Sequence, residues 1–256
     1  MPTTANTAPF LHGSDGSQGS GGERAGLDLR STHTDLAART YQILRDMIVT
    51  RAIQPGDKVT AEGLSRRFGV SRTTVKSALD QLAAEGLVVV RPQVGTFVRG
   101  LTVQDVHDIW DVRALIEPRA AQLGVVRASP DQRRELQELV EATAPLVEGH
   151  EYRMEQYPRF IELDRRLHEL VVETAGNSFL LRLYRQTAVH IHTVSYANWR
   201  ARRGLRRADT AFQEHSAIAA AYADGDAVRA AALLTGHIER SRAVALQALA
   251  RAGGAI

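Results

Sequence analysis

The pattern of apolar and polar residues predicts two structural units. Over residues 36–100, apolar positions at helical spacing are followed by short β-branched runs, which indicates helices and a β-hairpin. After residue 100 the pattern stays helical to the end of the chain, and turn residues separate long amphipathic segments. The expected helical segments are residues 102–127, 130–148, 153–175, 178–203, 209–223 and 226–252. We therefore expect a mainly α protein, in which an all-α antiparallel helical bundle follows the smaller unit.

Residues 64–98 predict a helix, a tight turn, a second helix and a β-hairpin. Gly69 permits the sharp turn, and the hydroxyl of Ser71 can cap the second helix. This arrangement is typical of a winged helix-turn-helix, in which the second helix enters the major groove of DNA and the hairpin lies beside it. The exposed start of that helix is expected to carry Arg72, Thr73, Thr74 and Lys76. Cationic groups and hydroxyls there suit phosphates and base edges, and an ordinary small α/β packing unit is the alternative.

The remaining N-terminal residues divide into a tail and a first helix. Residues 1–34 are rich in Gly, Ser, Thr and Ala and lack apolar periodicity, so we expect a disordered tail. Tyr41, Leu44 and Ile48 share one face of the expected first helix, and Arg45 lies on its polar side. The expected organisation is a tail at 1–34, a winged helix-turn-helix DNA-binding domain at 35–100 and an all-helical domain at 101–252.

The charge is distributed unevenly along the chain. The net charge of the 256 residues is +3, but residues 36–100 carry ten Lys or Arg against five acids, which is +5 and leaves −2 for the rest. A basic module joined to a mildly acidic one fits a nucleic-acid reader with a separate second domain. A solvated surface that is basic by chance is the alternative.

The composition excludes several classes of protein. The chain contains no cysteine, which excludes disulfides and thiolate metal sites and favours an intracellular compartment. No run of about eighteen apolar residues indicates a membrane span, and the N-terminus lacks the basic and apolar blocks of a secretion signal. We therefore expect a cytoplasmic protein that does not interact with membranes.

Three places in the expected bundle carry residues that can bind a metal ion. Asp164 and His168 lie one helical turn apart and therefore point the same way. His215 and His237 lie beside apolar residues of two later segments. Together these residues offer one carboxylate oxygen and three imidazole nitrogens, a set that suits Zn²⁺, Ni²⁺ or Mn²⁺ with positions open for a ligand. The spacing alone does not join the helices, and a local Asp/His pair with core histidines is the alternative.

A series of short motifs runs through residues 41–98. In order they are Pro55-Gly56, Val70-Ser71-Arg72-Thr73, Ala78-Leu79, Glu85-Gly86-Leu87 and Gly95-Thr96-Phe97-Val98. The series resembles the DNA-binding domain of the GntR family of bacterial transcriptional regulators, although Lys76 stands where that family usually has Arg. The resemblance implies that DNA is contacted by Arg45, Arg72, Thr73, Lys76 and Gly95.

A second series begins after residue 108. It consists of Arg113 with Glu117, Asp164 with His168, Gly176-Asn177, Glu214-His215, Gly225-Asp226 and His237. The series resembles the FCD effector domain of the FadR subgroup, which is an all-helical bundle. The resemblance implies that a divalent metal is bound by Asp164, His168, His215 and His237. It also implies effector contacts from Arg113 and Asn177, since a guanidinium can bind a carboxylate bidentately. An intrahelical pair with Glu117 is the alternative for Arg113.

Two functions fit these observations. The first is a ligand-responsive transcriptional regulator, in which a homodimer binds operator DNA and a small organic-acid effector changes operator affinity by binding two conformations unequally. The second is a metal-dependent hydrolase or lyase. We expect the first and no enzymatic activity, because an enzyme does not explain residues 60–98. Further candidates for lining the effector pocket, or for filling the core, are His190, His192, Tyr196 and Trp199.

Overall fold

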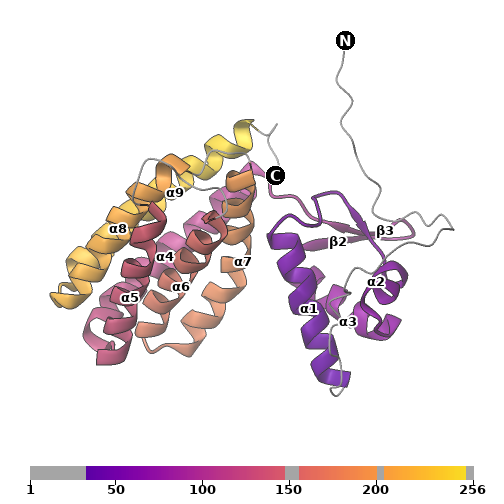
Figure 1. The fold of residues 1–256 in the computed structure, drawn as a ribbon, viewed down its shortest axis with the longest axis horizontal. Coiled ribbons are helices and arrows are strands. Elements are labelled where there is room, and N and C mark those ends of the chain that lie inside the picture. Colours follow the sequence, from indigo (N-terminus) through magenta and orange to yellow (C-terminus); the bar gives the residue numbers. More distant parts are fainter. Residues whose placement is uncertain (1–32, 148–155, 201–204, 252–256) are drawn as a thin grey trace, which may run out of the picture.

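The computed structural model describes residues 33–147, 156–200 and 205–251, which form two units (Figure 1). The N-terminal unit combines three helices with a small sheet, and the C-terminal unit is a bundle of helices. The predicted fold class, a winged helix-turn-helix followed by an all-α bundle, is therefore confirmed. The predicted tail at 1–34 lies outside the described residues, apart from residues 33 and 34 at the start of the first helix.

The N-terminal unit contains the helices α1 (His33–Val49), α2 (Ala61–Phe68) and α3 (Arg72–Ala84) and the strands β1 (Lys58–Val59), β2 (Val88–Arg91) and β3 (Gly95–Val98). The strands form one antiparallel sheet in the order β1-β3-β2. Val88 lies opposite Val98, and Lys58 lies opposite Phe97. β2 and β3 are the predicted hairpin. The strand β1 was not predicted, because two residues are too few to establish an alternating pattern.

Side-chain caps set the bounds of the helix-turn-helix. The Thr60 hydroxyl accepts a hydrogen bond from the amide of Gly63 at 3.1 Å and begins α2. Gly69 ends α2 in the left-handed region, at φ 68°. The Ser71 hydroxyl accepts a hydrogen bond from the amide of Thr74 at 3.0 Å and begins α3. These caps explain how the chain turns and restarts within a few residues.

The prediction for Thr74 was wrong. Its side chain was expected on the exposed start of α3, but Thr74 is only 2% exposed. Its hydroxyl lies 2.8 Å from the hydroxyl of Ser71 and takes part in the cap. Thr74 is the third residue of α3, and in this helix it lies on the same side as buried Val75 and Ala78. The surface available to DNA is therefore smaller than the sequence indicated.

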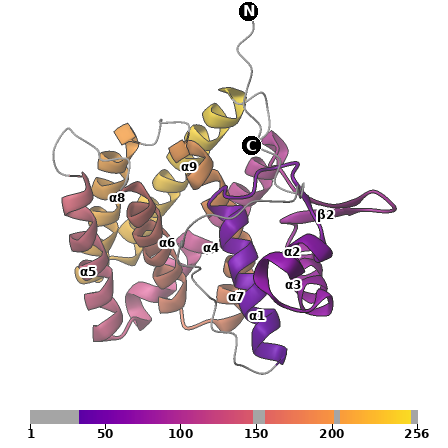
Figure 2. The same cartoon turned by 45° about the vertical axis from the view of Figure 1, so that its right-hand side comes forward.

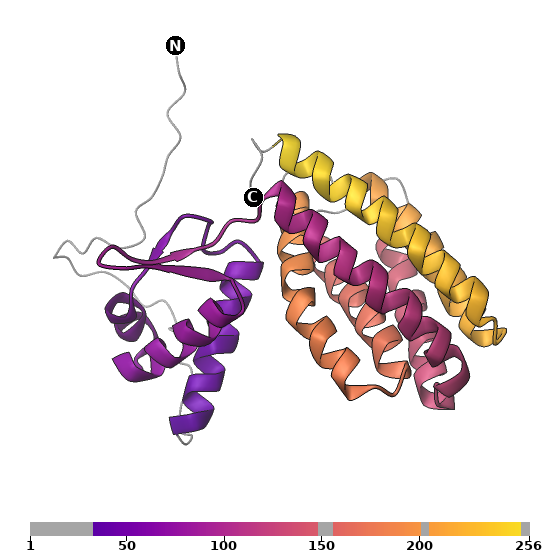
Figure 3. The same cartoon turned by 180° about the vertical axis from the view of Figure 1, so that it is seen from behind.

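Within the described residues the C-terminal unit has the helices α4 (Val103–Arg127), α5 (Pro130–Val147), α6 (Tyr157–Thr174), α7 (Ser178–Arg200), α8 (Leu205–Ala223) and α9 (Ala227–Arg251). α4 and α9 lie side by side along the bundle (Figure 3). Gly124 allows α4 to approach its neighbours, because a Cβ there would overlap Thr174 Oγ1 and lie 2.7 Å from the Tyr222 hydroxyl. None of the helices described is both long and apolar enough to cross a membrane.

The two units meet where α1 lies beside α7 (Figure 2). Val189 of α7 is 1% exposed and packs into the apolar core of the N-terminal unit. The next residue, His190, places Nε2 2.9 Å from the carbonyl oxygen of Glu85. The hydroxyl of Tyr41 donates to the carboxylate of Glu85 at 2.7 Å. The α1–α7 contact thus combines apolar packing with hydrogen bonds at the end of α3.

Candidate functional site

The structure brings together the four residues that were predicted to bind a metal. Asp164 and His168 lie on α6, His215 lies on α8 and His237 lies on α9. One ligand atom from each of the four lies within 4.8 Å of the others. The three histidines are buried, and Asp164 is half-buried. The packing of α6, α8 and α9 therefore brings the four residues together, which their spacing in the sequence alone could not predict.

Two ring nitrogens of this cluster, His168 Nε2 and His215 Nε2, lie close to the carboxylate of Asp164. Asp164 Oδ1 lies 3.5 Å from His215 Nε2 and 3.9 Å from His168 Nε2. Both of these nitrogens are buried, and neither has a hydrogen-bond partner among the described residues. A buried polar atom without a partner costs about 1–3 kcal/mol. A metal ion between them would satisfy both nitrogens, so the residues present fit a metal site.

A buried carboxylate orients the first of these histidines. Glu117 of α4 is fully buried, and its Oε2 lies 2.7 Å from His168 Nδ1. Burial alone raises the pKa of Glu117, but the charge of Arg113 and the hydrogen bonds from Arg113 and His168 outweigh that effect and hold the pKa at about 2. The ionised carboxylate accepts a hydrogen bond from the protonated Nδ1 of His168. The lone pair of His168 therefore lies on Nε2, which faces the cluster.

A second carboxylate holds His237 in the same way. Glu214 Oε2 lies 2.5 Å from His237 Nδ1, and its Oε1 accepts a hydrogen bond from Arg240. Burial lowers the pKa of His215 to about 4, although Asp164 opposes the effect. His215 is therefore neutral near pH 7, and one of its ring nitrogens is available as a ligand.

A cavity of about 70 Å³ lies beside the cluster and includes Asp164 and His237 in its wall. Arg113 also lines this cavity, and its Nε donates to Glu117 Oε1 at 2.6 Å. Arg113 therefore makes the intrahelical pair and also lines the cavity, and its contact with an effector stays a prediction. Most of the remaining wall is apolar, as at Trp110 and Phe160. A small molecule with one anionic group matches such a lining.

The structure does not bring Asn177 to this cavity. Asn177 precedes α7, and its side-chain oxygen accepts hydrogen bonds from the amides of Phe179 and Leu180, both at 3.1 Å. His190 and His192 also lie elsewhere, because they face the N-terminal unit. The side chain of Trp199 lies outside the described residues.

The predicted DNA contacts lie in two places. Arg72, Thr73 and Lys76 are exposed at the start of α3, and Gly95 begins the second strand of the wing. Arg72 approaches Glu62 of α2 at 3.2 Å. Arg45 is separate from this group, since it lies on α1 and lines a hollow between the two units.

The contacts of Glu117 with His168 and of Glu214 with His237 were not predicted from the sequence. A signal for both was present. Glu117 follows Arg113 by one helical turn, and Glu214 directly precedes His215. Which histidine each acid contacts depends on packing between helices, so the sequence could not supply that pairing.

Comparison with known proteins follows the same division of the chain. Residues 108–240 match the FCD domain, and residues 36–98 match bacterial regulatory proteins of the gntR family. YdhC of Bacillus subtilis, an uncharacterized HTH-type transcriptional regulator, is 28% identical over 178 residues, which cover 70% of this chain and 76% of that protein. A probable D-xylose utilization operon transcriptional repressor of Paenarthrobacter nicotinovorans is 29% identical over 236 residues, covering 89% of this chain and 94% of that protein.

Two solved structures share the fold. E. coli McbR/YncC has a TM-score of 0.71 at 20% identity and covers 83% of this chain and 97% of its own. A putative transcriptional regulator GntR from Rhodococcus sp. RHA1 has a TM-score of 0.69 at 21% identity, covering 83% and 98%. The relatives are regulators rather than enzymes, which argues against the hydrolase or lyase hypothesis. The chain belongs to the gntR family of bacterial regulatory proteins and carries an FCD domain.

Proposed function

We propose that this transcriptional regulator binds operator DNA through its winged helix-turn-helix and senses a small carboxylate metabolite at a divalent metal in its FCD domain. The observation that carries the proposal is the pair of buried, unpartnered Nε2 atoms of His168 and His215, which face Asp164 beside a cavity. A purely structural histidine cluster would leave both atoms unsatisfied. A metal ion and its ligand would satisfy them.

The proposed metal ligands are Asp164, His168, His215 and His237. Nitrogen and carboxylate donors suit Zn²⁺, Ni²⁺ or Mn²⁺, and four protein ligands leave positions free on an ion that takes five or six. When bound, the ion supplies a positive centre for an effector carboxylate. Arg113 lines the same cavity and adds a second positive charge for that carboxylate. We do not include Asn177 in the effector site, because it caps α7 instead.

The proposed DNA contacts are Arg45, Arg72, Thr73, Lys76 and Gly95. Arg72, Thr73 and Lys76 are exposed together on the first turns of α3, where a recognition helix meets base edges and phosphates. Gly95 lies at φ 136°, a conformation that favours glycine, and so lets the wing turn closely. The wing adds positive charge, since the Arg91 guanidinium lies 4.8 Å from the centre of the Phe97 ring.

We propose that the regulator acts as a homodimer in the cytoplasm, where its DNA partner is found. Val112, Leu115 and Val126 of α4 are exposed and share one face of that helix, as expected for a surface that another copy covers. The two winged helix-turn-helix domains of a dimer can bind the two half-sites of an operator. The effector then changes operator affinity by favouring one arrangement of the readers.

The experiment combines metal analysis, DNA binding and ligand identification on the purified full-length protein. We expect about one divalent ion per chain by elemental analysis, and loss of that ion in His215→Ala. Mobility-shift assays with DNA flanking the gene should reveal a specific fragment. Mass spectrometry of co-purifying small molecules should identify an organic acid that changes the shift. Full metal content in His215→Ala would reject the four-ligand site, and turnover of substrate without DNA affinity would reject the regulator.

A further inference from the structure

A polar hollow of about 380 Å³ lies between the two units. Tyr41, Gln42 and Arg45 contribute from α1, and Glu85 contributes from the end of α3. The opposite wall comes from α6 and α7, through Arg165, Glu169, Arg185, Gln186, Ala188 and His192. The hollow shares no lining residue with the cavity beside the histidine cluster, so the two are separate sites.

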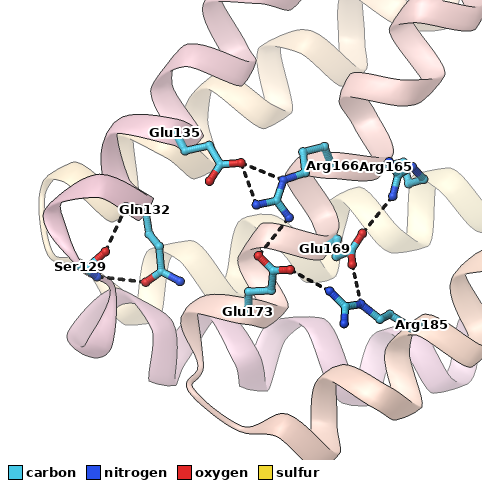
Figure 4. A network of polar contacts seen from close by, with 8 residues as sticks. All are labelled: Ser129, Gln132, Glu135, Arg165, Arg166, Glu169, Glu173 and Arg185. Atoms are coloured by element: carbon cyan, nitrogen blue, oxygen red, sulfur yellow. Dashed lines mark hydrogen bonds and ion pairs between the residues drawn. The ribbon is translucent and has the colours of Figure 1, made fainter.

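The acidic groups of the hollow already have partners. Glu169 accepts from Arg165 at 2.9 Å and from Arg185 at 2.6 Å, and Arg185 continues to Glu173 (Figure 4). Glu85 accepts hydrogen bonds from Tyr41 at 2.7 and 2.8 Å. Arg165 and Arg185 offset the charge of Glu169, and the hydroxyl of Tyr41 satisfies the oxygens of Glu85. The lining carries three guanidinium groups against two carboxylates, a net charge of +1, and Arg45 is the guanidinium without an ion pair among the described residues.

Arg45 and His192 are donors in the hollow that have no acceptor among the described residues. Arg45 and His192 make no hydrogen bond or ion pair with any residue that the structure describes. His192 is only 5% exposed, and it lines the hollow. Burial lowers the pKa of His192 well below its ordinary value, and the charges of Arg165 and Arg45, which line the same hollow, lower it further. Arg45 and His192 therefore offer unpaired donors to an oxyanion that enters the hollow.

We propose that the hollow between the units binds a small dianion, with a phosphate or carboxylate group held by Arg45 from α1 and by Arg165 and His192 from the bundle. The ligand contacts both the N-terminal unit and the C-terminal unit, so it stabilises the arrangement in which the two units are docked. This site is additional to the metal centre. Because Arg45 is also a proposed DNA contact, the dianion and the operator compete for it.

The test is isothermal titration calorimetry of the full-length protein with inorganic phosphate and, separately, with succinate, at matched ionic strength. We expect saturable binding of at least one of the two. Arg45→Gln should weaken that binding roughly tenfold or more, since a hydrogen bond to a charged group contributes about 1.5–3 kcal/mol. Arg165→Gln should act in the same direction.

Two variants keep the result specific. Arg182→Gln removes the same charge from an exposed part of α7 that lies against Phe179 and outside the hollow, so its binding should stay unchanged. His215→Ala removes a proposed metal ligand and no lining residue of the hollow, so the binding that Arg45→Gln weakens should persist in it, which separates this site from the metal centre. A preference for phosphate or for succinate identifies the group recognised. No saturable binding of either probe, or binding that His215→Ala abolishes and Arg45→Gln leaves intact, would overturn the proposal.

Discussion

Glu117 Oε2 of α4 lies 2.7 Å from His168 Nδ1 of α6, and the side chain of Glu117 has no exposed surface. Replacing this carboxylate with an amide removes the negative charge that orients His168 and strengthens it as a ligand. We expect Glu117→Gln to lower metal affinity about 10–100-fold, the range for partners of ligand histidines. Competition with a chromophoric chelator measures the affinity.

Glu117→Gln also leaves Arg113 without its charged partner, so loss of folding must be distinguished from loss of metal. Thermal unfolding without metal provides that check. Glu214→Gln tests the same idea at His237, where the acid is less buried. Glu239→Gln is the matched control, because Glu239 is exposed and its nearest cation, Arg242, lies 3.9 Å away. Equal metal affinity in all three variants would contradict the role of these acids.

The contact between His190 and Glu85 predicts a pH-dependent domain arrangement. A carbonyl only accepts, so His190 Nε2 carries the proton of this hydrogen bond. Burial lowers the pKa of His190 from its ordinary value of 6.5. When the units separate, His190 regains that value and binds protons more readily, so docking is complete above about pH 6.5 and weakens as the pH falls toward the lowered pKa.

Small-angle X-ray scattering over this pH range measures the docking. The radius of gyration should grow on acidification in the wild type. His190→Gln keeps a donor to Glu85 but does not titrate, so its radius should stay constant. A wild type and variant that expand in parallel would assign the change to another group.

Arg72→Ala tests the recognition helix. Arg72 is exposed at the start of α3, and its nearest described anion is Glu62 at 3.2 Å. Loss of one phosphate contact should weaken operator binding and reduce the slope of log affinity against log salt by about 1. Fluorescence anisotropy over a salt series measures both. Arg182→Ala removes an exposed arginine from α7 and serves as the control, and an unchanged slope in Arg72→Ala would exclude a phosphate contact.

Gly124→Ala tests the packing of α4. The added Cβ would meet Thr174 Oγ1 and the Tyr222 hydroxyl, which are themselves hydrogen-bonded at 3.0 Å. Overpacking of this kind costs about 1–3 kcal/mol of unfolding free energy. Urea denaturation measures the loss. Thr174→Ala in the same chain should recover part of it, and wild-type stability in Gly124→Ala alone would show that the helices shift apart at little cost.

Much of the fold was predictable because turn residues mark its boundaries. Ser129-Pro130 separates α4 from α5, and Gly176-Asn177 separates α6 from α7. The ends of these helices follow from local chemistry, since proline favours a first turn and glycine supplies the left-handed residue after a last turn. The strand β1 follows instead from pairing with β3, which is a long-range contact, and it was missed.

The candidate site was predictable in its residues and not in its arrangement. Asp164 and His168 share a helix face by spacing alone, whereas His215 and His237 come from other helices and joined the set only through the family resemblance. Asn177 illustrates the limit of that resemblance, because a motif position can serve a helix cap. The hollow that contains Arg45 and His192 depends on how two units dock, which no local pattern encodes.

Val189 has a consequence for how such regulators can be recombined. Its side chain belongs to α7, yet it packs into the apolar core around Leu44 and Leu82 of the N-terminal unit. An N-terminal unit expressed without the residues after 100 would lack the Val189 side chain and would have a cavity in its core. Exchange of DNA-binding domains between regulators, in the laboratory or in evolution, therefore has to preserve the packing of residue 189 of α7 against the exchanged domain. The two units are separate along the chain, but they are not interchangeable parts.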